Sequence, residues 1–235
     1  MKYVPDPSGR FDRRPHYDPS ELDEDCEDTI TEFMRQRCGE FRLPIPTDVL
    51  TKLIESEAEE LDLYADLATE GPEVEGVTHF FADSRPKVQI SHLLTQDEGR
   101  GHRLRTTLTH EFGHVKFHAP LWAVEFDRQS RYSKPHVNRT PPQQCHRSGI
   151  LDAKEYDWME WQAGYISGAL LMPESHIRNL AEAALPCTGR RRPSAPDDAA
   201  VVQLVADVVG TFNVSEYAAQ VRLAKLGYLM LNPRA

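Results

Sequence analysis

Apolar side chains recur at helical spacing in two stretches of the first half of the chain. Residues 104–118 carry one apolar stripe at positions i, i+4, i+8 and i+11, formed by Leu104, Leu108, Phe112 and Val115. Residues 47–68 carry a second set of apolar positions at helical spacing. The pattern therefore predicts two amphipathic helices, one in each stretch.

Two short runs between these helices have the composition of β-strands. Residues 77–82 and 87–91 combine β-branched and aromatic side chains, and the turn-forming sequence Asp-Ser-Arg-Pro separates them. The chain should therefore contain a small β-sheet next to the helix at residues 104–118.

The end of the chain predicts two further short helices, over residues 201–209 and 215–226. Ser215 is placed to cap the start of the second helix, and Gly227 is placed to end it. Two short helices with this separation have the spacing of a helix-turn-helix unit.

Polar segments separate or precede these elements and set the expected domain boundaries. The polar, charged segment 1–28 has no apolar period and predicts disorder, and the proline-containing residues 122–157 predict a long surface loop. We therefore expect a disordered segment 1–28, a main domain 29–185 that includes this loop, a linker 186–198 and a helical segment 199–235.

Composition adds limits to this picture. The chain has 235 residues with 40% hydrophobic content, which suits one main globular domain. Its four cysteines form no C-x-x-C pair and predict reduced thiols; Cys145-His146 could be a metal pair or a switch, but such a loop dipeptide more often has no role. No signal peptide or membrane-spanning stretch is evident, so a cytoplasmic location and no membrane partner are expected.

The charge balance argues against nucleic acid as a partner. The chain has a net charge of -10, and its last helical segment offers only Arg222, Lys225 and Arg234 as cations. Phosphate contacts dominate DNA affinity, so an acidic protein of this kind is poorly suited to DNA binding. The run Arg190-Arg191-Arg192 lies in the expected linker and is better explained as a solvated segment.

The helix predicted at residues 104–118 also contains the pattern H-E-x-x-H. His110 and His114 are one turn apart and share a face about 200° from the apolar stripe, so both imidazoles can bind a single metal ion. Glu111 lies about 100° round from His110, where a general base for water activated by the metal is needed. Gly113 is costly inside a helix, which suggests that another segment packs closely there.

A catalytic zinc ion usually takes three protein ligands, and the best third candidate is Glu160. As a helix, residues 160–173 place several small residues on the same side as Glu160, which would allow close approach to the histidine helix: Ala163, Gly164 and Ser167. Asp157 and Glu155 compete for the ligand role, and Asp157 could instead orient a ligand histidine.

Four motifs resemble the ImmA/IrrE zinc metallopeptidases of bacteria and their mobile elements. Two of them are T-L-T-H-E-F-G-H-V-K-F-H at residues 107–118 and E-W-Q-A-G-Y-I-S-G-A-L-L-M-P at residues 160–173. The others are L-P-I-P at residues 43–46 and F-N-V-S-E-Y-A-A-Q-V-R-L-A-K-L-G at residues 212–227. They occur in the family's order and span about residues 40–230.

The resemblance implies zinc ligands at His110, His114 and Glu160 and a catalytic glutamate at Glu111. It implies a zincin-like α+β fold, mainly helical with a small sheet, and a zinc-dependent endopeptidase that cleaves a repressor or another regulatory protein. The chain departs from the family at Gly164, at Ile166-Ser167 and in the 46 positions from His114 to Glu160. These changes keep the ligands but put substrate preference in doubt.

Several details follow from this function and stay open at the sequence level. His118 and Tyr165 are candidates for a second oxyanion donor, although His118 better suits packing or a role behind the ligands, because a fourth ligand would close the water position. The strand segment 88–91 is a plausible edge for binding a peptide, and an ordinary sheet strand is at least as good an explanation. The competing function is a zinc-binding regulatory or DNA-binding protein that acts without proteolysis.

Overall fold

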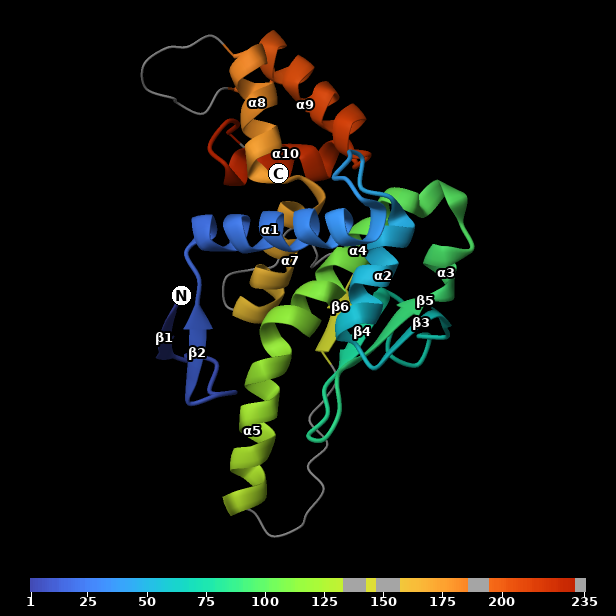
Figure 1. Cartoon of the computed structure of the whole chain (residues 1–235), viewed down its shortest axis with the longest axis vertical. Helices are drawn as coiled ribbons and strands as arrows, with labels where there is room; N and C mark the ends of the chain where they lie inside the picture. Colours follow the sequence, from blue (N-terminus) through green and yellow to red (C-terminus); the bar gives the residue numbers. More distant parts are fainter. Residues whose placement is uncertain (133–142, 147–156, 186–194, 231–235) are drawn as a thin grey trace. The chain divides into compact units, whose positions relative to one another are not determined.

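The computed structural model describes residues 1–132, 143–146, 157–185 and 195–230, which form an α+β protein with a small mixed sheet (Figure 1). Its contacts divide the chain into two compact units. The first combines Met1–Glu21 with Thr47–Ser167, and the second combines Leu22–Pro46 with Gly168–Ala235. The helices that cross these boundaries contribute residues to both units.

The sheet of the first unit contains four strands: β3 (Glu60–Ala65), β4 (Val74–His79), β5 (Lys87–Ser91) and β6 (Gln143–His146). Their order is β3-β5-β4-β6. β5 runs parallel to β3 and antiparallel to β4, and β6 is antiparallel to β4. The two strands predicted at 77–82 and 87–91 are therefore confirmed as β4 and β5, although β4 starts three residues earlier and ends at His79.

Two expectations for this region are wrong. The helix predicted over residues 47–68 is only α2 (Thr47–Glu57), and residues 60–65 form β3 instead. The sequence Leu61-Asp62-Leu63 alternates apolar and polar positions, which is the period of a strand and not of a helix. β5 lies between β3 and β4, so the expected peptide-binding edge at residues 88–91 is an inner strand.

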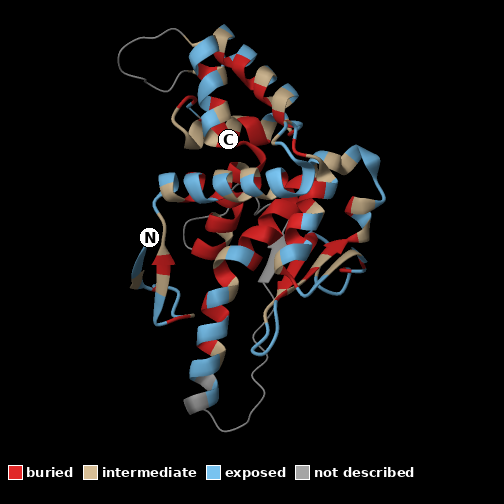
Figure 2. Cartoon of the chain, in the orientation of Figure 1, coloured by how far each residue is buried: buried red, intermediate tan, exposed pale blue. Residues whose placement is uncertain are grey.

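Helix α4 (Gly101–Gly113) contacts β4, β5 and α2. It follows α3 (His92–Thr95) and a 3-10 turn, Glu98–Arg100, and it continues through a π-helical turn, His114–His118, into α5 (Ala119–Tyr132). Every residue from Arg105 to Gly113 is buried, whereas much of α5 is exposed (Figure 2). The predicted loop at 122–157 thus begins as helix and includes β6, and its remaining residues, 133–142 and 147–156, lie outside the described residues.

The N-terminal segment has regular elements where the sequence predicted disorder. β1 (Lys2–Pro5) pairs antiparallel with β2 (Arg13–His16), and α1 (Pro19–Cys38) follows. Between the strands, the Asp6 carboxylate accepts hydrogen bonds from the Phe11 backbone at 3.0 Å and from Trp158 Nε1 at 3.1 Å. Burial alone would raise the pKa of Asp6, but its hydrogen bonds outweigh burial and lower it. The hairpin is therefore fixed by a residue far away in the sequence.

The second unit contains α8 (Glu174–Ala184), α9 (Ala199–Phe212) and α10 (Glu216–Lys225) together with most of α1. The two predicted tail helices are confirmed. The Ser215 side chain accepts a hydrogen bond from Ala218 N at 3.2 Å, and Gly227 has a φ of 78°, as expected for residues that cap α10. The helix-turn-helix assignment itself stays a prediction.

Arg222 does not lie on the surface of this unit. Its guanidinium forms an ion pair with Asp23 at 2.6 Å, and both side chains are buried. Its Nε also donates to the Met172 carbonyl at 3.2 Å. Arg222 is therefore part of the core, and the other expected cations at residues 190–192 and Arg234 lie outside the described residues.

None of the helices in the described part of the chain has both the length and the apolar content needed to span a membrane.

Candidate metal centre

The two histidines of the H-E-x-x-H pattern converge at the C-terminal end of α4. His110 lies in the last turn of α4 and His114 is the first residue of the π-helical turn, so their rings lie one turn apart on the same face. Their Nε2 atoms are 3.2 Å apart, and both side chains are fully buried.

Glu160 of α7 (Trp158–Leu171) completes this group. Its Oε2 lies 3.1 Å from His110 Nε2, and its Oε1 lies 3.3 Å from His114 Nε2. Burial alone would raise the pKa of the Glu160 carboxyl, but the charge on His114 and the hydrogen bonds from both rings hold it well below its ordinary value. Among the described residues, this is the one group of three such side chains positioned to hold a metal ion.

The three side chains lie close enough together to hold one metal ion. Zinc bonds to nitrogen and carboxylate oxygen are about 2.0–2.1 Å long, so neighbouring ligand atoms in a tetrahedron are about 3.3 Å apart. The two histidine Nε2 atoms are 3.2 Å apart, and each lies 3.1 to 3.3 Å from a different oxygen of Glu160. With one ligand atom taken from each side chain, the three atoms lie within 4.8 Å of one another. Two imidazoles and one carboxylate are also the donor set of several catalytic zinc sites, and they leave a fourth position open.

Of the two alternatives for the third ligand, Asp157 does not join this group. The Asp157 carboxylate lies 3.9 Å from an Arg10 guanidinium nitrogen, where it forms a weak surface ion pair. Glu155 lies outside the described residues.

Glu160 can reach the histidines because α7 packs unusually close to α4. A Cβ atom built on Gly113 would lie 3.1 Å from Ala163 Cα, so a larger residue here would push against the backbone of α7. One turn earlier, Ser167 Oγ lies 2.8 Å from Thr109 Oγ1 and donates to the Thr106 carbonyl at 3.0 Å. The predicted close contact at Gly113 and the predicted small face of α7 are thus the two sides of one interface.

Glu111 points from the same helix toward β4. Its side chain is fully buried, and Thr78 Oγ1 donates a short hydrogen bond to its carboxylate. The position that a Cβ atom of Gly76 would take lies 2.5 Å from Glu111 Oε1, so any larger residue at position 76 would displace the carboxylate. Strand β4 therefore fixes where Glu111 lies beside the ligands.

His118 forms a hydrogen-bonded chain behind the ligands. His118 Nε2 lies 3.1 Å from Gln162 Oε1, and His118 Nδ1 lies 2.9 Å from His114 Nδ1. Burial lowers the pKa of His118 well below its ordinary value, with the charge on His114 acting in the same direction, so the ring is neutral.

One pattern of protons satisfies this chain. A neutral His118 that donates from Nε2 to Gln162 accepts at Nδ1, so His114 donates from its own Nδ1. With a metal bound in place of the His114 contact to Glu160, the Nε2 lone pair of His114 would be available to the ion. Both ring nitrogens of His118 are then engaged, which removes it as an oxyanion donor and favours the expected role behind the ligands. Tyr165 lies about 140° round α7 from Glu160, with its ring 5.6 Å from Trp161, and its proposed oxyanion role stays a prediction.

Sequence reasoning missed three residues of this centre: Gly76, Thr78 and Gln162. Gly76 and Thr78 have the i, i+2 spacing that places two side chains on one face of a strand, which is the only local sign of their role. Gln162 follows Glu160 by two positions, and its link to His118 depends on how α7 packs against the turn His114–His118.

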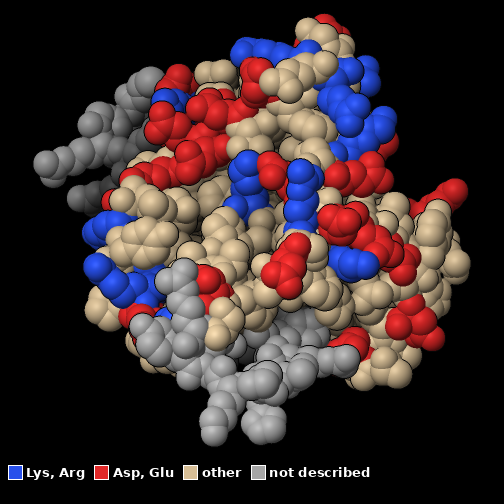
Figure 3. Space-filling view, turned by 60° about the horizontal axis from the view of Figure 1, so that its bottom comes forward, with Lys and Arg blue, Asp and Glu red and all other residues tan. Residues whose placement is uncertain are grey.

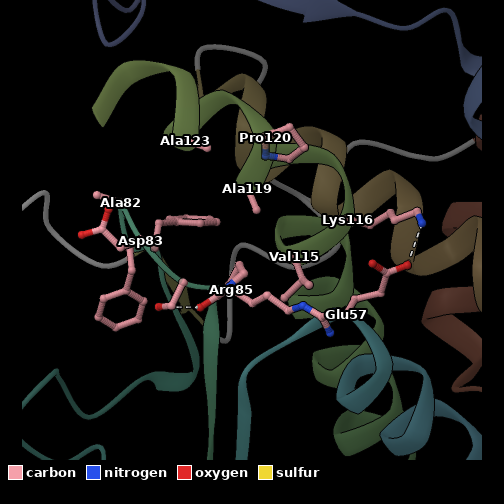
Figure 4. A pocket seen from close by; sticks show the side chains of 13 residues that line it. Glu57, Ala82, Asp83, Arg85, Val115, Lys116, Ala119, Pro120 and Ala123 are labelled. Atoms are coloured by element: carbon pink, nitrogen blue, oxygen red, sulfur yellow. Dashed lines mark hydrogen bonds and ion pairs between the residues drawn. The ribbon is translucent and has the colours of Figure 1, made fainter. Parts of the chain in front are cut away.

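A separate pocket of about 550 Å³ lies beyond the metal ligands, between α5, the turn His114–His118 and the β4–β5 connection. Figure 4 shows its labelled lining, in which Val115 and Ala119 face Arg85 and an ion pair joins Lys116 Nζ to Glu57 at 2.7 Å. None of the three candidate ligands lines this pocket; from the turn His114–His118, Val115 and Lys116 line it instead.

The chain was also compared with known proteins. Its sequence matches no protein-family model and none of the curated proteins searched. Family membership therefore rests on the four sequence motifs and stays a prediction.

Proposed function

We propose that this chain is a zinc-dependent endopeptidase with a zincin-like catalytic unit. One observation carries the proposal: two imidazoles and a carboxylate from two separate helices converge, with one ligand atom from each within 4.8 Å of the others. A buried glutamate, Glu111, directly follows the first of these histidines. If the H-E-x-x-H pattern had occurred by chance, there would be no reason for a third ligand to lie beside it, or for α7 to pack closely enough to place that ligand.

His110, His114 and Glu160 would hold Zn²⁺. When bound, zinc polarises a substrate carbonyl and lowers the pKa of its water to about 7. The chain supplies the proton transfers: Glu111 takes a proton from the attacking water and passes it to the leaving amine. Thr78 holds the Glu111 carboxylate in one orientation, so the base does not have to reorganise during the reaction.

The family resemblance supplies the substrate class, a bacterial transcriptional repressor or another regulatory protein that is inactivated by cleavage. A cytoplasmic site of action is part of the same proposal. The alternative, zinc-stabilised regulation without proteolysis, offers no chemical reason for Glu111 to be buried beside the ligands.

The proposal predicts that metal binding and catalysis can be separated by mutation. The protein should bind one Zn²⁺ per chain, and His110→Ala, His114→Ala or Glu160→Ala should remove it. Glu111→Gln should keep the ion but lower cleavage by at least about 10²-fold, because the amide cannot accept the proton. Metal analysis and cleavage of repressors encoded beside its gene, with denatured β-casein as a second substrate, would measure both effects.

Glu98→Gln is the matched control, because Glu98 is exposed in the turn before α4. It should leave both zinc content and cleavage unchanged. Full zinc occupancy in Glu160→Ala would exclude Glu160 as a ligand. Cleavage at the parental rate by Glu111→Gln would show that this site is not the hydrolytic centre.

A further inference from the structure

Strand β4 has one edge that an extended peptide could use to reach the metal centre. Its residues Gly76 and Thr78 lie against Glu111, so this strand runs directly beside the proposed base. One edge of β4 pairs with β5 inside the sheet. The other edge would be the outer edge of a three-stranded sheet if β6 were not there.

β6 covers this second edge over the positions that border Glu111. Its antiparallel register pairs Gln143 with Thr78, Gln144 with Val77 and Cys145 with Gly76. The strand also contacts α4, the helix that carries both histidine ligands. Backbone groups of β4 next to the proposed base are thus already paired with a segment of the same chain.

β6 is a short strand with an irregular pairing. It has four residues, and its register shifts between Val74 and Gly76. In the sequence, β3, β4 and β5 follow one another, whereas β6 comes later, between α5 and α7. A short strand added from a separate segment is the kind of pairing that another extended chain can replace, because strand addition uses backbone groups that every peptide has.

We propose that β6 is a built-in occupant of the peptide-binding edge of β4, and that an extended segment of a polypeptide substrate binds by displacing it. This inference rests on the proposed function, because it assumes that the ligand of this edge is a peptide. The substrate would bind as an extended, unstructured segment. Basal activity would be low until β6 leaves the edge of β4.

Two consecutive prolines test the strand pairing. Successive N–H groups of a strand point to opposite edges, so Gln144→Pro with Cys145→Pro removes one N–H that faces β4, whichever residue carries it. The matched control, Gln144→Ala with Cys145→Ala, removes the same side chains and keeps both N–H groups. Each pair is made in the full-length Glu111→Gln protein, so that bound peptide is not cut.

The probe is a fluorescent peptide with the sequence of residues 141–148, carrying serine at the position of Cys145. Fluorescence anisotropy measures its affinity for the three zinc-loaded proteins. While β6 occupies the edge, only the fraction of molecules with an open edge can bind the peptide, and the apparent affinity is reduced by that fraction. The double-proline protein should therefore bind the peptide at least about 10-fold more tightly than the parent or the double-alanine protein. Bound peptide should also slow hydrogen exchange at residues 74–79.

Equal binding by all three proteins, with zinc retained, would overturn the proposal. Equally tight binding by the double-alanine and double-proline proteins would overturn it as well, since side chains and not the strand would then block the edge. If the double-proline protein loses zinc and unfolds, a protein with residues 133–156 replaced by a Gly-Ser linker takes its place. Failure of that protein to fold or to bind the peptide would show that β6 is a permanent part of the sheet.

Cleavage of denatured β-casein by the same variants with Glu111 intact separates this inference from the proposed function. Tight peptide binding without any casein cleavage would support the displaceable strand and count against the peptidase. Casein cleavage at one rate by all variants, together with unchanged peptide binding, would support the peptidase and overturn the role of β6.

Discussion

His118 and Gln162 lie behind His114 of the candidate metal centre. With a metal bound, the hydrogen-bonded chain from Gln162 through His118 would keep a proton on His114 Nδ1 and leave the Nε2 lone pair of His114 for the ion. Partners of this kind orient a ligand ring and raise its basicity, and their loss typically weakens metal binding. His118 and Gln162 are therefore positioning residues.

Replacing Gln162 tests this chain. Gln162→Leu removes the acceptor and should weaken zinc affinity by about 10- to 100-fold. Gln162→Glu keeps an oxygen at the same reach and should bind zinc close to the parental affinity. Competition with a zinc chelator measures both values without depending on activity. Equal weakening by the two substitutions would contradict the positioning role and indicate that Gln162 acts only through packing.

Single residues of the centre differ in how far the sequence predicts them. His110, Glu111 and His114 follow from helical geometry alone, because spacing within one helix fixes their directions. Glu160 needs one more step, the small residues that let α7 approach. The contact of Thr78 with Glu111 joins positions 33 residues apart, and no local pattern encodes it.

The contact between α4 and α7 determines where Glu160 lies. Gly113→Ala would place a methyl group 3.1 Å from the Ala163 backbone, which cannot move without shifting α7. Such overpacking should lower the free energy of unfolding by about 1–3 kcal/mol. It should also weaken zinc binding, because Glu160 moves with its helix. Urea unfolding of the metal-free protein and chelator competition measure the two effects.

Gly101→Ala on the same helix is the control. A Cβ atom there meets nothing within 4 Å, so the substitution should be neutral or stabilise by up to about 1 kcal/mol through helix propensity. Similar stability and zinc affinity in the two alanine variants would show that close packing at Gly113 does not position Glu160.

Elements were predicted well where one period continued and poorly where it changed. α4, α9 and α10 follow from uninterrupted helical spacing, and α10 also has the predicted cap at Ser215. The region at residues 47–68 combines a helix with the strand β3, and treating both as one period produced a single long helix. The position of β5 inside the sheet depends on which strands pair, and the sequence of β5 alone does not contain that information.

In the second unit of the molecule, a buried ion pair holds distant segments together. Arg222 and Asp23 come from opposite ends of the chain and are 1% and 4% exposed, so loss of one partner leaves a buried charge unpaired. Arg222→Met should therefore lower the free energy of unfolding by about 3–5 kcal/mol, and adding Asp23→Leu should restore much of it. Urea unfolding of the single and double variants measures the coupling.

Arg178→Met serves as the comparison, because Arg178 pairs with Glu174 on the surface of α8 with half of its side chain exposed. An exposed pair of this kind contributes at most about 1 kcal/mol. Equal losses in the Arg222 and Arg178 variants would contradict the structural role of the buried pair. From the sequence, Arg222 counts among the cations available to a partner. Composition alone cannot show that Asp23, 199 positions away, pairs with it.

The charges of the whole molecule bear on the competing regulatory function. The net charge is -10, and acidic side chains lie among the basic ones on the face shown in Figure 3. Of the two cations on α10, Arg222 is buried, which leaves Lys225 as the α10 cation near solvent. DNA affinity depends mainly on phosphate neutralisation, so the intact protein should show no salt-sensitive binding to duplex DNA at physiological ionic strength.

Fluorescence anisotropy with a labelled pool of random duplexes tests this expectation at about 50 mM and 200 mM salt. A protein with many phosphate contacts loses about 10³-fold or more in affinity between these concentrations. Lys225→Glu distinguishes the source of any binding, because it reverses the charge on α10 without touching the buried pair. Tight binding that falls steeply with salt and disappears in Lys225→Glu would make α10 a DNA reader and favour the regulatory function. Absence of binding in both proteins would leave α10 with a structural role, in which Arg222 packs against Asp23 and the Met172 carbonyl.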